Sequence, residues 1–111
     1  MAKNEEEAEL AGFGRFSEAA LLILISLAAG PKHGYAMTED IEAVAGVKLG
    51  PGTLYGALAR LETKGLIEVV STEDKRRIPY RLTGAGEQAL RAQLAAMSAM
   101  ARLGEGRLAN A

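Results

Sequence analysis

Side chains that commonly perform enzymatic chemistry are scarce in this chain. It has 111 residues, of which none is cysteine and one, His33, is histidine. The lack of cysteine excludes thiolate catalysis, disulfides and cysteine-ligated metals, and one histidine cannot by itself form a catalytic or metal cluster. We therefore expect a protein that is not an enzyme and that uses no cofactor or metal ion.

Basic side chains, in contrast, are concentrated in one part of the sequence. Residues 1–47 carry three basic and eight acidic side chains, a net charge of −5, whereas residues 48–91 carry eight basic and five acidic, a net charge of +3. Residues 92–111 carry two basic and one acidic, which brings the total to −1. A local basic excess is the electrostatic signature of a nucleic-acid contact. The middle segment is therefore the candidate DNA-binding part.

The densest basic cluster is Lys75-Arg76-Arg77, with Arg81 shortly after it. It lies between two segments with the alternation of β-strands, so we expect it at the tip of a hairpin. Basic side chains there can neutralise DNA phosphates. A charge run at such a tip is usually only solvated, and the adjacent acidic residues 73 and 74 argue for that alternative. The position of the cluster, one hairpin after a candidate recognition helix, favours the DNA contact.

The candidate recognition helix is the segment from Pro51 to Lys64, which Gly65 ends. At about 100° per residue, three leucines share one face, whereas the opposite face holds small or polar residues. Small residues let a helix approach a DNA groove closely, although a surface helix that is merely rich in glycine and alanine would look the same. Tyr55 lies at the edge of this face, where its hydroxyl can bind phosphate. The candidate DNA contacts are Gly52, Thr53, Tyr55, Gly56, Arg60, Lys64, Lys75, Arg76, Arg77 and Arg81.

The other segments predict a single, mostly α-helical domain of the α+β class, a winged helix-turn-helix with a C-terminal dimerisation helix. Ser17 and Thr83 are expected helix caps, and Pro79, which lacks an N–H, should place its strand at a sheet edge. Tyr35 and Tyr80 are expected in the core. Helices are expected over 17–29, 34–45, 51–64 and 83–103, and strands over 66–71 and 78–82. The expected parts are an acidic tail or short helix (1–16), the winged helix-turn-helix (17–82), the dimerisation helix (83–104) and a disordered tail (105–111).

The last helix carries a wide apolar stripe at spacings of three and four residues. So small a domain has little surface of its own to cover that stripe, so we expect it to pack against a second copy of the chain. The alternative is that it packs on the first helix of its own chain. The candidate interface residues are Leu90, Leu94, Met97, Met100 and Ala101.

Four segments together resemble motifs of the PadR family of transcriptional regulators. They are GPKHGY (30–35), LGPGTLY (49–55), LARLETKGLI (58–67) and RRIPYRLT (76–83). The resemblance implies a DNA-binding homodimer, a repressor that a small hydrophobic effector releases, with His33 at a turn or helix start. The chain departs from the family pattern at Gly50, where serine is frequent, and at Gly56, where proline is frequent, and its wing is shorter.

The expected function is therefore a cytoplasmic regulator that binds a pseudo-palindromic operator in double-stranded DNA. The longest apolar run, residues 19–29, is too short to span a bilayer, and the acidic N-terminus is unlike a signal peptide, so no membrane association is expected. The alternative function is a winged-helix module that binds other proteins and binds DNA only weakly. The sequence pI of about 5.9 favours that alternative slightly.

Overall fold

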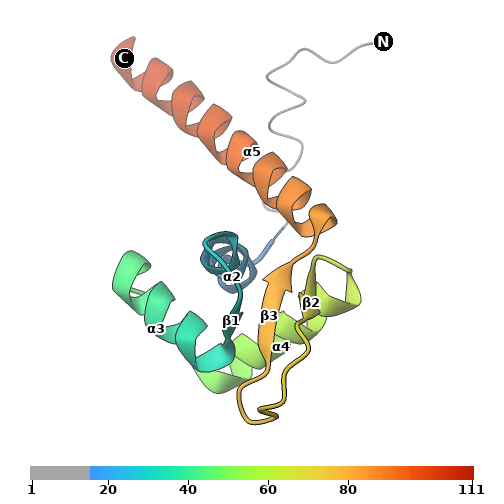
Figure 1. Ribbon diagram of the computed structural model, residues 1–111. Coiled ribbons are helices and arrows are strands. Elements are labelled where there is room, and N and C mark those ends of the chain that lie inside the picture. Colours follow the sequence, from blue (N-terminus) through green and yellow to red (C-terminus); the bar gives the residue numbers. More distant parts are fainter. Residues whose placement is uncertain (1–15) are drawn as a thin grey trace.

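The computed structural model describes residues 16–111, and its centre is helix α2 (Glu18–Ala28). The side chain of Ser17 caps this helix by accepting the N–H of Ala20 at 3.1 Å, as the sequence predicts. Ile23 and Leu24 are fully buried, and α2 contacts α3, α4, α5 and β3. Figure 1 shows α2 nearly end-on in the middle of these elements. The expected acidic tail or short helix over 1–16 lies almost wholly outside the described residues.

Helices α3 (Gly34–Ala45) and α4 (Pro51–Thr63) form the helix-turn-helix. Gly46 follows α3 with φ 68°, a left-handed conformation that glycine adopts without strain. Pro51 is the first residue of α4, where its missing N–H costs no hydrogen bond. Both helices pack on α2 through one aliphatic core, whose largest fully buried side chains are Ile23, Leu24, Met37, Ile41, Leu58, Leu61 and Ile67.

The wing is part of a three-stranded antiparallel sheet in the order β1-β3-β2. The strands are β1 (Lys32–His33), β2 (Ile67–Val69) and β3 (Pro79–Leu82). The predicted hairpin is confirmed, but the edge position expected for Pro79 is wrong, because β1 pairs with the other side of β3. Pro79 is tolerated since it is the first residue of the strand, and its carbonyl still accepts the N–H of Val70 at 2.8 Å.

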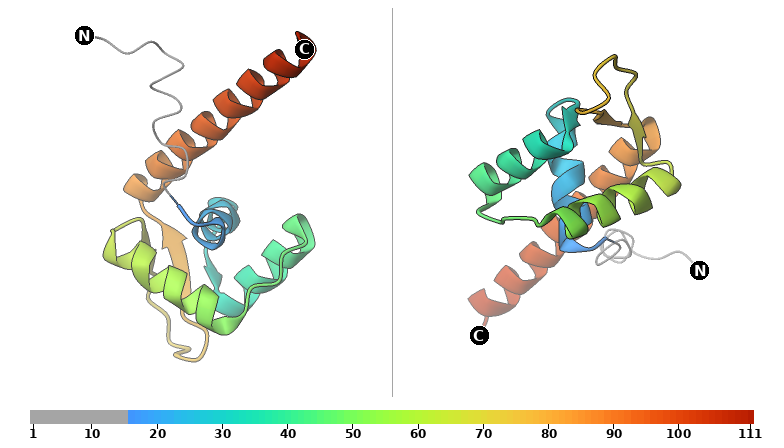
Figure 2. Two further views of the ribbon diagram at one scale, coloured as in Figure 1. Left: turned by 180° about the vertical axis from the view of Figure 1, so that it is seen from behind. Right: turned by 90° about the horizontal axis from the view of Figure 1, so that it is seen from below.

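Helix α5 (Gly84–Ala109) is longer than the sequence indicates. Its cap is Thr83, as predicted, but the helix continues to Ala109, so the disordered tail expected over 105–111 is wrong. Gly104 and Gly106 lie inside the helix, and the side chain of Asn110 donates to the carbonyl of Gly106 at 3.0 Å. The beginning of α5 packs on α2 and β3, whereas its end projects away from the rest of the molecule (Figures 1 and 2).

Candidate nucleic-acid interface

Helix α4 has the two faces that the sequence predicts. Its leucines are buried, whereas Gly52, Thr53 and Arg60 are exposed and Gly56 is half-buried. A Cβ atom on Gly56 would lie 3.5 Å from Nη1 of Arg60, so the guanidinium lies close over this glycine. The absence of a side chain at position 56 thus leaves a shallow surface, with one arginine lying along it.

The wing tip, residues 72–77, is folded by its own acidic residue. The carboxylate of Asp74 accepts the N–H of Arg76 at 3.0 Å, and its backbone carbonyl accepts the N–H of Arg77 at 3.2 Å. Thr72 in turn accepts the N–H of Asp74 at 3.2 Å. Asp74 therefore shapes the turn, which gives it a local role beside the basic cluster. The side chains of Lys75, Arg76 and Arg77 are exposed.

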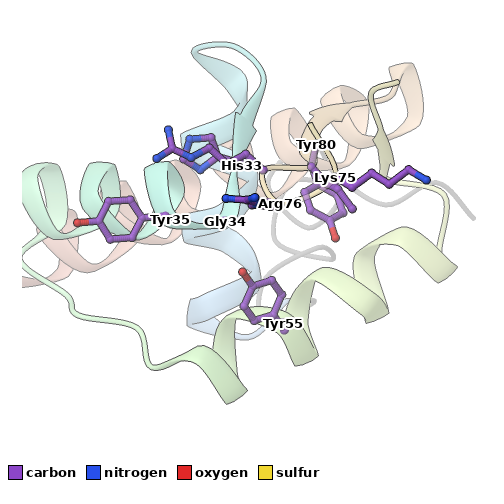
Figure 3. Close-up of a pocket in the computed structure, with 9 residues that line it drawn as sticks. His33, Gly34, Tyr35, Tyr55, Lys75, Arg76 and Tyr80 are labelled. Carbon is purple, nitrogen blue, oxygen red and sulfur yellow. The ribbon is translucent and has the colours of Figure 1, made fainter. Parts of the chain in front are cut away.

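A pocket of about 270 Å³ joins the wing tip to the helix-turn-helix. It is lined by His33, Gly34, Tyr35, Tyr55, Lys75, Arg76, Arg77, Ile78 and Tyr80 (Figure 3). The structure thus brings one predicted contact of α4, Tyr55, together with the predicted basic cluster of the wing. In Figure 1 the wing tip lies at the lower edge of the molecule beside α4, far from the end of α5.

Tyr55 packs where α4 meets the start of α3. A Cβ atom on Gly34 would lie 2.8 Å from the Tyr55 hydroxyl, so glycine at this position makes the close contact possible. His33 caps α3, since its Nδ1 accepts the N–H of Ala36 at 3.2 Å, which confirms its expected role at a helix start. Tyr55 remains 55% exposed despite this contact, so its ring is accessible.

The other two tyrosines differ from each other. Tyr35 was expected in the core, but it is 69% exposed and extends away from Tyr55 along α3 (Figure 3), so that expectation is wrong. Tyr80 packs against the core. Burial raises the pKa of Tyr80, and the nearby Glu62 and Tyr55 raise it further. The sequence carries a signal for this exposure, because Thr38, Glu39 and Glu42 follow Tyr35 at helical spacings of three, four and seven residues and share its face of α3.

Two predicted DNA contacts lie outside this surface. Arg81 pairs with Glu68 across the β3–β2 ladder at 2.7 Å and lines a separate groove between α2 and α5. The Arg81 side chain points away from the core, because side chains alternate along a strand and the neighbouring Tyr80 faces the core. Lys64 follows the last residue of α4, where its ammonium lies 6.0 Å from the ring centroid of Phe16.

The predicted interface residues of α5 fall into two groups. Leu90 is only 5% exposed and belongs to the core of its own chain, so at this position the apolar stripe packs within the domain. Leu94, Met97, Met100 and Ala101 are all exposed, and Leu94 is 42% exposed. The apolar stripe therefore changes role along the helix, from intramolecular core to open surface.

A helix-turn-helix with an exposed small-residue face, followed by a hairpin with a basic tip, defines a winged helix-turn-helix DNA-binding protein. The comparison with known families agrees, since residues 23–92 match the model of the transcriptional regulator PadR-like family. The chain belongs to that family, whose members are DNA-binding regulators rather than enzymes. In the described residues no helix is both long and apolar enough to cross a membrane.

Two curated relatives are similar in sequence. One is an uncharacterized 37.1 kDa protein in a transposon of Streptomyces fradiae, 46% identical over 84 residues, or 76% of this chain. The chain spans only 24% of that protein's length. The other is the transcriptional regulator Rv3488 of Mycobacterium tuberculosis, 37% identical over 84 residues, which cover 74% of this chain and 78% of that protein.

Solved structures show the same fold. A PadR family transcription regulator from hypervirulent Clostridium difficile superposes with a TM-score of 0.73 at 26% identity, over 83% of this chain and 99% of that one. RosR from H. salinarum superposes with a TM-score of 0.68 at 28% identity, over 87% of this chain and 94% of that one. The winged helix-turn-helix predicted from sequence is thus confirmed.

Proposed function

We propose that this chain is a transcriptional repressor that binds a pseudo-palindromic operator as a homodimer in the cytoplasm. The observation that supports it best is the pocket that Tyr55, at the edge of the shallow face of α4, lines together with the basic residues of the wing tip. Two such surfaces in a dimer would enter successive major grooves whose centres are about 10 base pairs apart.

The residues of this surface divide into two kinds of contact. Gly52 and Gly56 let the helix approach the bases, and Thr53 and Arg60 supply the groups that read them, because arginine binds guanine with two hydrogen bonds. The phosphate contacts come from Tyr55 and from Lys75, Arg76 and Arg77. Lys64 and Arg81 are left out of these contacts, because both lie away from the pocket and Arg81 is already paired with Glu68.

Homodimerisation is assigned to the exposed part of α5. Leu94, Met97, Met100 and Ala101 form an apolar surface within residues 92–101, a segment without any charged residue. Such a continuous apolar surface indicates a protein contact, and a symmetric pair of helices would bury it.

The test of the dimer is a pair of matched single substitutions. Leu94→Asp places a charge in the apolar surface and should produce a monomer or an unfolded chain. Ala95→Asp adds the same charge one residue later on the helix, at a position turned by about 100°, and should stay dimeric. Light scattering with circular dichroism distinguishes the outcomes. A folded dimer with Leu94→Asp contradicts the assignment.

We further propose that a small hydrophobic effector releases the repressor. A groove of about 520 Å³ lies beside the contact between α2 and α5. Four leucines line it (Leu27, Leu82, Leu90 and Leu94), together with Ala28, Pro31 and the charged side chains of Arg81, Glu87 and Arg91. An apolar molecule bound there would contact both the DNA-binding domain and the dimerisation helix. Leu82→Arg should abolish release of operator DNA by an apolar effector while operator binding persists, and release by the variant would contradict this site.

DNA binding is tested against the alternative of a protein-interaction module. Fragments of genomic DNA that the purified protein retains would be sequenced to obtain the operator. Binding to it would then be compared by mobility shift with binding to scrambled DNA of the same length. A repressor should prefer the operator by about 10³-fold or more at physiological salt. Equal, weak binding to both DNAs would support the interaction module instead.

A further inference from the structure

Helices α4 and α5, the proposed recognition and dimerisation helices, meet at a joint held by hydrogen bonds. The turn that ends α4 contains Gly65 and Leu66, and the first residues of α5 lie against it. The Thr83 hydroxyl donates to the carbonyl of Gly65 at 2.7 Å and accepts the N–H of Gly86 at 3.0 Å. The backbone N–H of Thr83 also donates to the carbonyl of Leu66 at 3.1 Å. One residue thus connects both helix ends with three hydrogen bonds.

Gly86 brings the two backbones into direct contact at this joint. A Cβ atom on Gly86 would lie 1.9 Å from the carbonyl oxygen of Leu66, a distance that no side chain can occupy. Leu66 is itself buried, so the backbone segment that α5 touches is anchored in the core. The joint is therefore held by hydrogen bonds from Thr83 and by direct backbone contact between Gly86 and Leu66.

We propose that Thr83 and Gly86 are positioning residues that fix the direction of α5 relative to α4 and thereby set the operator spacing that the dimer accepts. The proposal rests on the proposed homodimer and DNA binding. In such a dimer, the partner is held through α5 and the DNA is contacted through α4. The joint between the two helices then determines how far apart the two copies of α4 lie.

A small rotation at the joint is large on the scale of DNA. Helix α4 has 13 residues and is therefore about 20 Å long. A rotation of the whole DNA-binding domain by about 10° about the joint displaces the far end of α4 by about 3.5 Å, close to the rise of about 3.4 Å for one base pair. A loosened joint should consequently let the dimer bind operators whose half-sites are shifted by one base pair.

The test measures binding of the full chain to operators whose central spacer is shortened or lengthened by one or two base pairs. The wild type should lose about tenfold or more in affinity for each base pair of change, because the DNA must twist or bend to fit. Thr83→Val keeps the shape of the side chain but removes both hydroxyl hydrogen bonds. It should reduce this loss to about threefold or less.

Two control variants separate positioning from helix stability. Ser17→Ala removes the cap of α2, which loses a comparable hydrogen bond away from the joint, and should keep the wild-type spacing preference. Thr83→Ser retains the hydroxyl group and should therefore keep the wild-type spacing preference. If Thr83→Val does not fold, Thr83→Asp can still accept the Gly86 N–H as a cap but cannot donate to the Gly65 carbonyl, and it should also broaden the spacing preference.

The outcomes distinguish this proposal from the one on which it rests. A folded Thr83→Val or Thr83→Asp dimer with the wild-type spacing preference would overturn the positioning role. A broadened preference in Ser17→Ala would overturn it as well, because general destabilisation would then be sufficient. Failure of the wild type to bind any operator would instead refute the proposed function.

Discussion

Replacing Arg76 and Arg77 with alanine should reduce the salt dependence of operator binding without changing the fold. Both side chains are exposed. The turn that holds them depends on their backbone N–H groups, which Asp74 accepts at 3.0 and 3.2 Å and which alanine retains. The substitution therefore removes two positive charges from the wing tip and leaves its conformation intact.

The magnitude follows from counterion release. Each neutralised phosphate contributes about 0.9 to the slope of log affinity against log salt concentration. Loss of one or two contacts should lower the slope by about one to two units per bound wing, and by about two to four units for a dimer with both wings bound. At two contacts per wing, the affinity change between 50 and 200 mM salt should shrink by roughly tenfold for each wing.

The assay is a titration of operator affinity with salt, wild type beside the double variant. Arg91→Ala with Arg107→Ala is the matched control, because it removes the same charge from α5, away from the wing. The control should keep the wild-type slope. An unchanged slope in the wing variant would refute the reasoning, and Lys48, exposed just before α4, would become the next candidate.

Three further predictions concern base reading, the helix joint and alkaline stability. Arg60→Ala should weaken operator binding by about 1–3 kcal/mol more than binding to random DNA, and equal losses in mobility shifts would assign Arg60 to phosphate. Gly86→Ala should lower the free energy of unfolding by about 3 kcal/mol or more, because the alanine Cβ would clash with Leu66. A wild-type midpoint of urea unfolding would contradict the contact. The folded-state pKa of Tyr80 is raised, so its contribution to stability is complete below its unfolded pKa of about 10 and is lost as the pH rises through the folded value. Tyr80→Phe should therefore lose less stability than the wild type between pH 9 and 11, measured by denaturation at each pH.

Local signals in the sequence predicted most of the helix boundaries. Ser17, His33 and Thr83 each accept a backbone N–H at a helix start, and such caps are recognisable because their chemistry is local. The two faces of α4 were also predictable, since helical periodicity alone separates its leucines from its small residues. The proposal that α4 faces DNA follows from that separation.

Features that depend on distant partners were not predictable. Strand β1 has only two residues, too few for any periodicity, yet it moves β3 from the edge to the centre of the sheet. Arg81 looks like a free basic residue until the register places it opposite Glu68. Leu90 and Leu94 belong to one stripe in sequence, and only the packing of α2 against α5 shows that the first is internal and the second exposed.

The small net charge of the chain does not argue against DNA binding, because the charges act locally. Electrostatic interactions between exposed groups are screened beyond about 8–10 Å at physiological salt. A phosphate beside the wing tip therefore interacts chiefly with the charges of the tip itself, where Lys75, Arg76 and Arg77 outnumber Glu73 and Asp74 by three to two. With so few basic residues in the wing, non-specific affinity should be low, and selection of the operator must depend on the bases that α4 contacts. If the proposed dimer forms, we expect it to leave random DNA readily and to depend on the correct spacing of its two copies of α4.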